Sequence, residues 1–186
     1  MKSQEKIQRQ KSNLGERSPD QISIAIIDDH SLVLDGLRRT LSVMDGDYHI
    51  VSAASPMEVL ARLSAGEVFD LFVCDLIMES MNGLAFLAAL KSRKSQIPVL
   101  LISGMTMDPP INQMKALGAK GFVHKSICPK SLEKIIQTIL SGDTFFPDDP
   151  KNDEAPSEYF TENELNIVHR LTPRQLDVLK ALAKGS

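Results

Sequence analysis

The chain has 186 residues and a net charge of −3, with 42% hydrophobic and 24% charged residues. This composition is typical of a soluble globular protein, and the length allows one domain plus an appendage, so fibrous and wholly disordered classes are excluded. The sequence contains no apolar segment long enough for a signal peptide or a membrane span, and we therefore expect a cytoplasmic protein without a membrane partner.

The predicted elements alternate along the chain. Residues 1–20 are polar, have no hydrophobic period and are expected to form a disordered extension. Strands are predicted over residues 22–28, 48–53, 70–75, 98–103 and 119–125. Helices are predicted over residues 32–44, 56–63, 84–90, 110–117 and 129–140. Because parallel strands need helical crossovers, this alternation predicts one domain over residues 21–142, with helices on both faces of a parallel sheet.

The predicted fold is α/β, a doubly wound five-stranded parallel sheet of flavodoxin-like order 2-1-3-4-5. A Rossmann dinucleotide-binding fold is the natural competitor. It requires a glycine-rich loop after the first strand, whereas the sequence DDHSLVLDG stands there. A Walker-type phosphate loop is also missing from the sequence, so these two kinds of nucleotide site are excluded.

Two further segments follow the predicted domain. Residues 143–170 are rich in acids and prolines and are expected to form an acidic linker, with a short helix near residues 159–169. Residues 171–186 begin a new helix, for which Thr172 is a natural N-cap and Pro173 suits the first helical position. The apolar face of this helix finds no partner in the chain, which predicts a helical C-terminal extension from a truncated domain.

Charged and hydroxyl side chains stand where the predicted strands end. They are Asp28 and Asp29 at the end of the first strand, Asp75 at the end of the third, Ser103 at the end of the fourth and Lys125 at the end of the fifth. The ligand site of a doubly wound sheet lies beyond the carboxyl ends of its strands, so we expect these side chains to meet. Three carboxylates repel one another unless a cation such as Mg²⁺ lies among them. A cation, a lysine and a hydroxyl are also the groups that stabilise a phosphoryl group arriving on a carboxylate.

Four motifs occur in order over residues 22–142: IIDDH, VCDLIM with a downstream NG, LLISGM and GFVHKS. Together they resemble the motifs of response regulator receiver domains. The resemblance implies that Asp75 is the phosphoacceptor. It further implies that Asp29 binds Mg²⁺ directly, that Asp28 binds it partly through water, and that the backbone carbonyl of Ile77 is another ligand.

The same resemblance implies roles for three residues on the fourth and fifth strands. Lys125 would pair with one phosphate oxygen, and Ser103 would hydrogen-bond another after phosphorylation. Phe122 matches the aromatic position that turns inward when the hydroxyl residue moves. A lone Phe at this position is equally explained as a core residue.

The sequence departs from the family pattern in several places. Glu79 stands where the family usually has a proline, and its negative charge is expected to weaken metal binding or to change partner choice. Ser126 replaces a proline that often follows the active-site lysine. Ile77 and Met105 are apolar at positions that tune phosphate hydrolysis, which predicts a long-lived phosphorylated state. His30, beside the acidic pair, is interpreted as a histidine at the start of a helix rather than a metal ligand.

The segment LTPRQLDVLKALAKG resembles the first helix of the helix-turn-helix domain of NarL/LuxR-type transcription factors. In that family a later helix enters the major groove. DNA binding is therefore expected of a full-length protein and not of this fragment.

The resemblance implies a two-component response regulator that accepts phosphate on Asp75 from a sensor histidine kinase or a phosphotransfer protein. Phosphorylation would favour a homodimer and switch a DNA-binding output that controls transcription. The only chemistry expected is self-catalysed phosphoryl transfer and slow autodephosphorylation, so the chain is not expected to be an enzyme. One alternative is a receiver that acts without phosphorylation, as an interaction or dimerisation module. Another is a phosphatase of the haloacid dehalogenase type, which needs an acid at the position of Ile77.

Overall fold

The computed structural model describes residues 21–104 and 109–147. The predictions for residues 1–20, for Met105, for the linker after residue 147 and for residues 171–186 lie outside the described residues. Five strands are present in the described ranges: β1 (Ile22–Ile27), β2 (Tyr48–Ala53), β3 (Leu71–Asp75), β4 (Val99–Ser103) and β5 (Gly121–His124). The helices there are α2 (Ser31–Ser42), α3 (Pro56–Ser64), α4 (Gly83–Ser92), α5 (Ile111–Leu117) and α6 (Pro129–Leu140).

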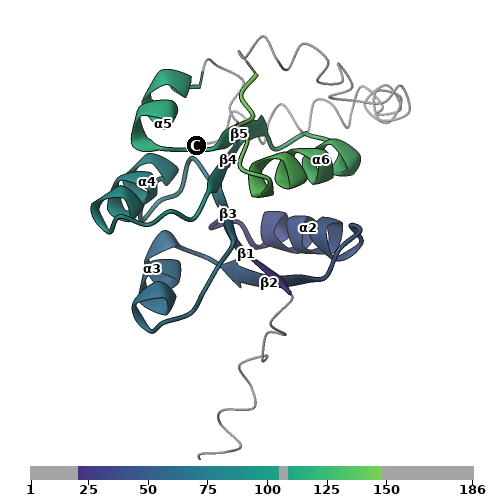
Figure 1. The fold of residues 1–186 in the computed structure, drawn as a ribbon, viewed down its shortest axis with the longest axis horizontal. Helices are drawn as coiled ribbons and strands as arrows, with labels where there is room; N and C mark the ends of the chain where they lie inside the picture. Colours follow the sequence, from purple (N-terminus) through teal and green to yellow (C-terminus); the bar gives the residue numbers. More distant parts are fainter. Residues whose placement is uncertain (1–20, 105–108, 148–186) are drawn as a thin grey trace, which may run out of the picture.

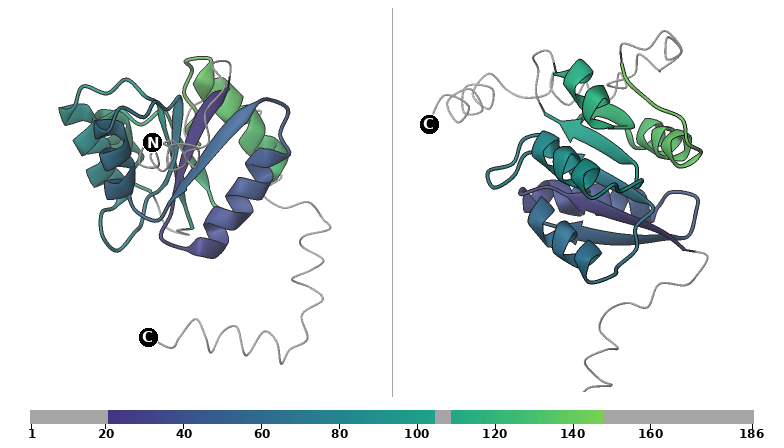
Figure 2. Two further views of the ribbon diagram at one scale, coloured as in Figure 1. Left: turned by 90° about the horizontal axis from the view of Figure 1, so that it is seen from below. Right: turned by 60° about the vertical axis from the view of Figure 1, so that its left-hand side comes forward.

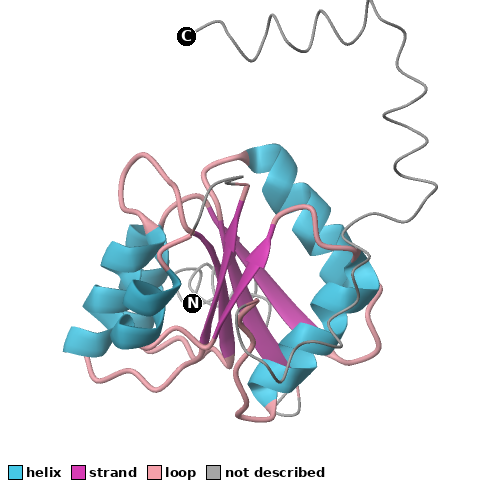
Figure 3. Cartoon of the chain, turned by 90° about the horizontal axis from the view of Figure 1, so that it is seen from above, coloured by secondary structure: helices cyan, strands magenta, loops and turns pink. Residues whose placement is uncertain are grey.

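The strands form one parallel sheet in the order β2-β1-β3-β4-β5, which confirms the predicted fold and topology. Helices α2 and α6 cover one face and α3, α4 and α5 cover the other (Figure 1). Two further views show the same three layers, and colouring by secondary structure separates the strands from the helices on either side (Figures 2 and 3). None of the helices in the described part of the chain has both the length and the apolarity needed to cross a bilayer.

The central strand β3 explains why the sheet is covered on both faces. All five of its residues are buried. Successive side chains of a strand point to opposite faces, so Phe72 and Cys74 join the core beneath α3, α4 and α5, whereas Leu71 and Val73 join the core beneath α2 and α6. A strand buried in this way has an apolar sequence without alternation, as observed here.

Several boundaries differ from the predictions. The predicted strand over residues 119–125 is only four residues long, and Lys125 lies just beyond it. The strand begins later than predicted because Gly118 and Ala119 form the C-terminal cap of α5. Gly118 adopts a left-handed conformation with φ 97°, and the N–H of Ala119 donates to the carbonyl oxygen of Met114, which closes the helix.

The packed unit also continues beyond residue 142, into the beginning of the predicted linker. Phe145 forms a parallel bridge with Gly121, and the N–H of Phe122 donates to the carbonyl oxygen of Phe145 at 2.9 Å. The side chain of Phe146 is 2% exposed, and the ammonium of Lys115 lies 4.7 Å from its ring centroid. These contacts attach residues 145–146 to the edge of the sheet beside β5.

Candidate functional site

The strand ends bring the predicted side chains to one edge of the sheet. Strand β1 ends one residue before Asp28, and the neighbouring strand β3 ends with Asp75. The next strand, β4, ends with Ser103. Asp28, Asp75 and Ser103 are all buried, although the other buried residues of the described chain are almost entirely apolar. Burial of two carboxylates is costly unless each is paired, so their partners define the site.

Lys125 is the partner of both buried carboxylates. Its Nζ lies 2.7 Å from Oδ2 of Asp75, to which it donates a hydrogen bond, and 2.6 Å from Oδ2 of Asp28. The contact with Asp28 is an ion pair. Burial opposes the charged form of Lys125, but its contacts with Asp28 and Asp75 outweigh burial and raise the pKa of the ammonium above its ordinary value. The lysine is therefore held as a cation between the two acids.

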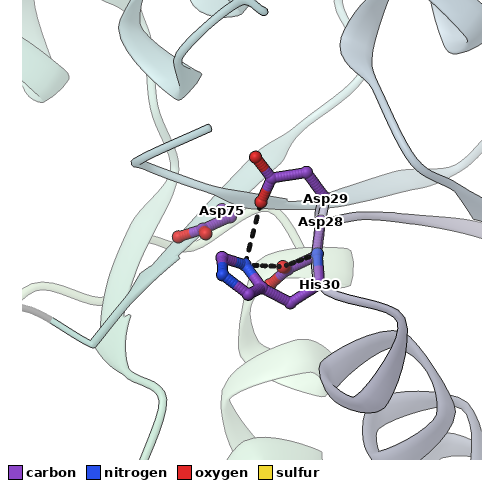
Figure 4. Close-up of side chains that lie close together, drawn as sticks. All are labelled: Asp28, Asp29, His30 and Asp75. Carbon is purple, nitrogen blue, oxygen red and sulfur yellow. Dashed lines mark hydrogen bonds and ion pairs between the residues drawn. The ribbon is translucent and has the colours of Figure 1, made fainter. Parts of the chain in front are cut away.

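The loop after β1 adds Asp29 and His30. The N–H of His30 donates to Oδ1 of Asp28 at 2.9 Å, and its Nδ1 lies 3.2 Å from the same oxygen. The same Nδ1 lies 2.9 Å from Oδ1 of Asp29. His30 is the N-cap residue of α2, as its interpretation as a helix-start histidine requires, and its side chain is 68% exposed. Figure 4 shows the His30 ring directed at Asp28 and Asp29, with the side chain of Asp75 close to the three of them.

The loop after β3 completes the site. The N–H of Ile77 donates to Oδ1 of Asp75 at 3.3 Å, and the N–H of Glu79 donates to Oδ2 of Asp29 at 2.9 Å. The hydrogen bond from Glu79 is the main cause of a pKa of Asp29 below its ordinary value; partial burial opposes this shift, and the nearby His30 adds to it. A cavity of about 330 Å³ opens here, lined by Asp29, His30, Ile77, Met78 and Glu79.

The remaining predicted residues are placed as follows. Ser103 is fully buried beside the end of β3, and its carbonyl oxygen accepts the N–H of Lys125 at 2.8 Å. Phe122 is 4% exposed and packs in the core that also contains Met114, which agrees with its interpretation as a core residue. The side chain of Ile77 is 54% exposed.

The donor set fits a hard divalent cation. One ligand atom from each of Asp28, Asp29, His30 and Asp75 can be chosen so that all four lie within 4.8 Å of one another. The three carboxylates and the ammonium of Lys125 together carry a formal charge of −2, which one divalent cation neutralises. Mg²⁺ prefers carboxylate oxygens and retained water, and the cavity beside Asp29 is open to solvent.

Two contacts of this site were missed by sequence reasoning. The ring of His30 touches both acids of the DDH motif, although the sequence indicates only a helix-start role for this histidine. The main chain at Glu79 binds Asp29, although only the charge of Glu79 was considered. The absence of proline at position 79 was the available signal, because a proline has no N–H to donate.

Comparison with known proteins shows the family to which the chain belongs. The profile of the response regulator receiver domain matches residues 24–137. The response regulator UvrY of Escherichia coli K12 is 24% identical over 164 residues, covering 88% of this chain and 75% of UvrY. The nitrate/nitrite response regulator NarL of the same strain is 29% identical over 167 residues, covering 88% of this chain and 76% of NarL.

Among solved structures, a LuxR family DNA-binding response regulator from Silicibacter pomeroyi superposes with a TM-score of 0.59 at 30% identity. The match covers 68% of this chain and 98% of that chain. The chain belongs to the response regulator receiver family. Receiver domains of this family interact with histidine kinases or phosphotransfer proteins and bind Mg²⁺ at an acidic pocket.

Proposed function

We propose that this chain is the phosphoryl-accepting part of a two-component response regulator, with Asp75 as the acceptor and Mg²⁺ as the cofactor. The observation that carries the proposal is the meeting of three carboxylates and Lys125 at one edge of the sheet, with Lys125 Nζ within 2.7 Å of both Asp28 and Asp75. Asp28, Asp29, Asp75 and the carbonyl of Ile77 would hold the metal.

In the proposed reaction, a carboxylate oxygen of Asp75 attacks the phosphorus of a phosphohistidine on a sensor kinase or phosphotransfer protein. A P–O bond forms and gives an acyl phosphate. The P–N bond breaks, its electron pair returns to the donor imidazole, and that nitrogen takes up a proton. When bound, Mg²⁺ supplies positive charge that stabilises the oxygens of the transferring phosphoryl group.

The residues of this chain position the acceptor. Lys125 holds Oδ2 of Asp75, and the N–H of Ile77 holds Oδ1, so the carboxylate has a fixed orientation before the donor arrives. After transfer, Lys125 pairs with a phosphate oxygen, and the buried hydroxyl of Ser103 donates to another. Ser103 ends β4 and Lys125 follows β5. A shift of these two residues toward the phosphoryl group would therefore change the packing around Phe122 and the surface formed by β4, β5 and their helices.

The effect of phosphorylation on the rest of the protein is inferred from the family relationship. We infer that phosphorylation favours a homodimer and that the full-length protein controls transcription through a LuxR-type helix-turn-helix domain, of which residues 171–186 are the beginning. The similarity to NarL and to a LuxR family DNA-binding response regulator supports this inference. A phosphatase of the haloacid dehalogenase type would need an acid two residues after Asp75, where the aliphatic side chain of Ile77 is exposed.

Incubation with acetyl phosphate and Mg²⁺, followed by intact-mass measurement, tests the proposal. One phosphoryl group per chain is expected, and none is expected without Mg²⁺ or in Asp75→Asn. An unmodified parent chain would favour the phosphorylation-independent module. Release of more than one equivalent of inorganic phosphate from an unactivated phosphate ester would favour the phosphatase.

A further inference from the structure

Each of the three clustered carboxylates accepts a hydrogen bond from the main-chain N–H of another residue. Asp28 accepts from His30 and Asp75 accepts from Ile77, each donor being two residues further along the chain. The donor to Asp29 is different, because it comes from Glu79, fifty residues away on the loop after β3. This hydrogen bond therefore connects the two loops from which the proposed metal ligands come.

The bond also assigns different surroundings to the two oxygens of Asp29. Oδ2 accepts the N–H of Glu79 at 2.9 Å, whereas Oδ1 lies 2.9 Å from His30 Nδ1. His30 has an exposed side chain that can rotate away, but the main chain of Glu79 cannot do so without moving the loop. Oδ1 is accordingly the oxygen that becomes available to a cation.

The side chain of Glu79 has no comparable part in the cluster. Residue 79 is exposed, and the group of potential ligand atoms found among the described residues consists of Asp28, Asp29, His30 and Asp75. The contact with Asp29 is made by an atom that every residue except proline possesses. Residue 79 thus affects Asp29 through its main chain.

We propose that the Glu79 main-chain N–H is a positioning group for the metal site: it fixes Asp29 so that Oδ1 is presented to Mg²⁺ as a single ligand oxygen. This proposal rests on the proposed function, because that function assigns the metal to Asp29. Ordering a ligand before the metal arrives removes part of the entropic cost of binding. Hydrogen-bond partners of metal ligands typically change metal affinity by about 10- to 100-fold when they are lost.

The test measures Mg²⁺ affinity by isothermal titration calorimetry, without any phosphoryl donor. Glu79→Pro removes the N–H and is expected to weaken Mg²⁺ binding about tenfold. Glu79→Ala is the matched control, since it removes the carboxylate and keeps the N–H, and its affinity is expected to stay within about threefold of the parent. An amide-to-ester replacement at Glu79 removes the N–H without the conformational restriction of proline, and should reproduce the loss.

The same substitution in an Asp29→Asn background separates positioning from general damage to the loop. If Glu79 acts through the carboxylate of Asp29, Glu79→Pro has much less effect on Mg²⁺ affinity in that background. Equal losses in both backgrounds, or an affinity of Glu79→Pro and of the ester within twofold of Glu79→Ala, would overturn the proposal. If the parent and its variants show these Mg²⁺ affinities but the parent accepts no phosphate, the proposed function alone is refuted. A parent chain that binds no Mg²⁺ would refute both the proposed function and the positioning role of Glu79.

Discussion

Lys125→Met is expected to destabilise the fold substantially, because it leaves two buried carboxylates without their shared cation. The ammonium lies within 2.7 Å of both Asp28 and Asp75, whose side chains are 0% and 4% exposed. Removing one partner of a buried ion pair costs about 3–5 kcal/mol. The side chain of Lys125 is 20% exposed, so water relieves part of this cost, and we expect a loss near the lower limit, about 3 kcal/mol.

Urea denaturation at neutral pH, followed by far-UV circular dichroism, measures this loss; tryptophan fluorescence is not applicable because the chain has no tryptophan. The melting temperature should fall by roughly 10 °C. Lys130→Met, at an exposed position on α6, is the control and should change stability by at most about 0.5 kcal/mol. Asp28→Asn should restore part of the stability lost in Lys125→Met. A loss no larger than that of Lys130→Met would refute the account of Lys125.

Three further predictions concern the surroundings of the site. Gly83→Ala should destabilise by about 1–3 kcal/mol in urea denaturation, because the new Cβ would lie 2.8 Å from the main-chain oxygen of Asp75; increased stability would contradict this. Asn82→Ala should cost about 1 kcal/mol, since Asn82 caps α4 through a 2.9 Å hydrogen bond, and an unchanged urea midpoint would contradict the capping role. The pKa of Asp29 is lowered in the fold from its ordinary 3.8, so the unfolded state takes up this proton first as the pH falls. The stability that ionised Asp29 contributes is thus present above pH 3.8 and is lost as the pH falls through the lower, folded-state pKa. Asp29→Asn should therefore show a shallower loss of stability on acidification than the parent. Urea denaturation at several pH values across this range measures the difference.

The fold was predictable from the sequence because each strand and helix had a local signal. The alternation of apolar strands with helical periods fixed the element order, and the missing glycine-rich loop separated the two doubly wound folds. The extension beside β5 had no such signal. Phe145 and Phe146 follow a helix and precede an acidic segment, and it is the pairing of Phe145 with Gly121 and the burial of Phe146 that show that they belong to the packed unit.

The site was predictable to the extent that strand ends determine it. Asp28 and Asp75 stand at the carboxyl ends of the neighbouring strands β1 and β3, and Lys125 follows β5 at the same edge of the parallel sheet, so the topology alone brings them together. The contact between Glu79 and Asp29 depends on the conformation of two loops that are fifty residues apart, which no periodicity describes.

Locating the phosphoryl group after reaction with a phosphorylated histidine donor and Mg²⁺ shows directly whether Asp75 is the acceptor. Borohydride reduces an aspartyl phosphate to homoserine, which peptide mass spectrometry can assign to one position. Homoserine is expected at position 75 and at no other aspartate. Homoserine at a different position, or a phosphoryl group that remains after borohydride treatment on a side chain other than that of Asp75, would contradict the assignment of Asp75 as the acceptor.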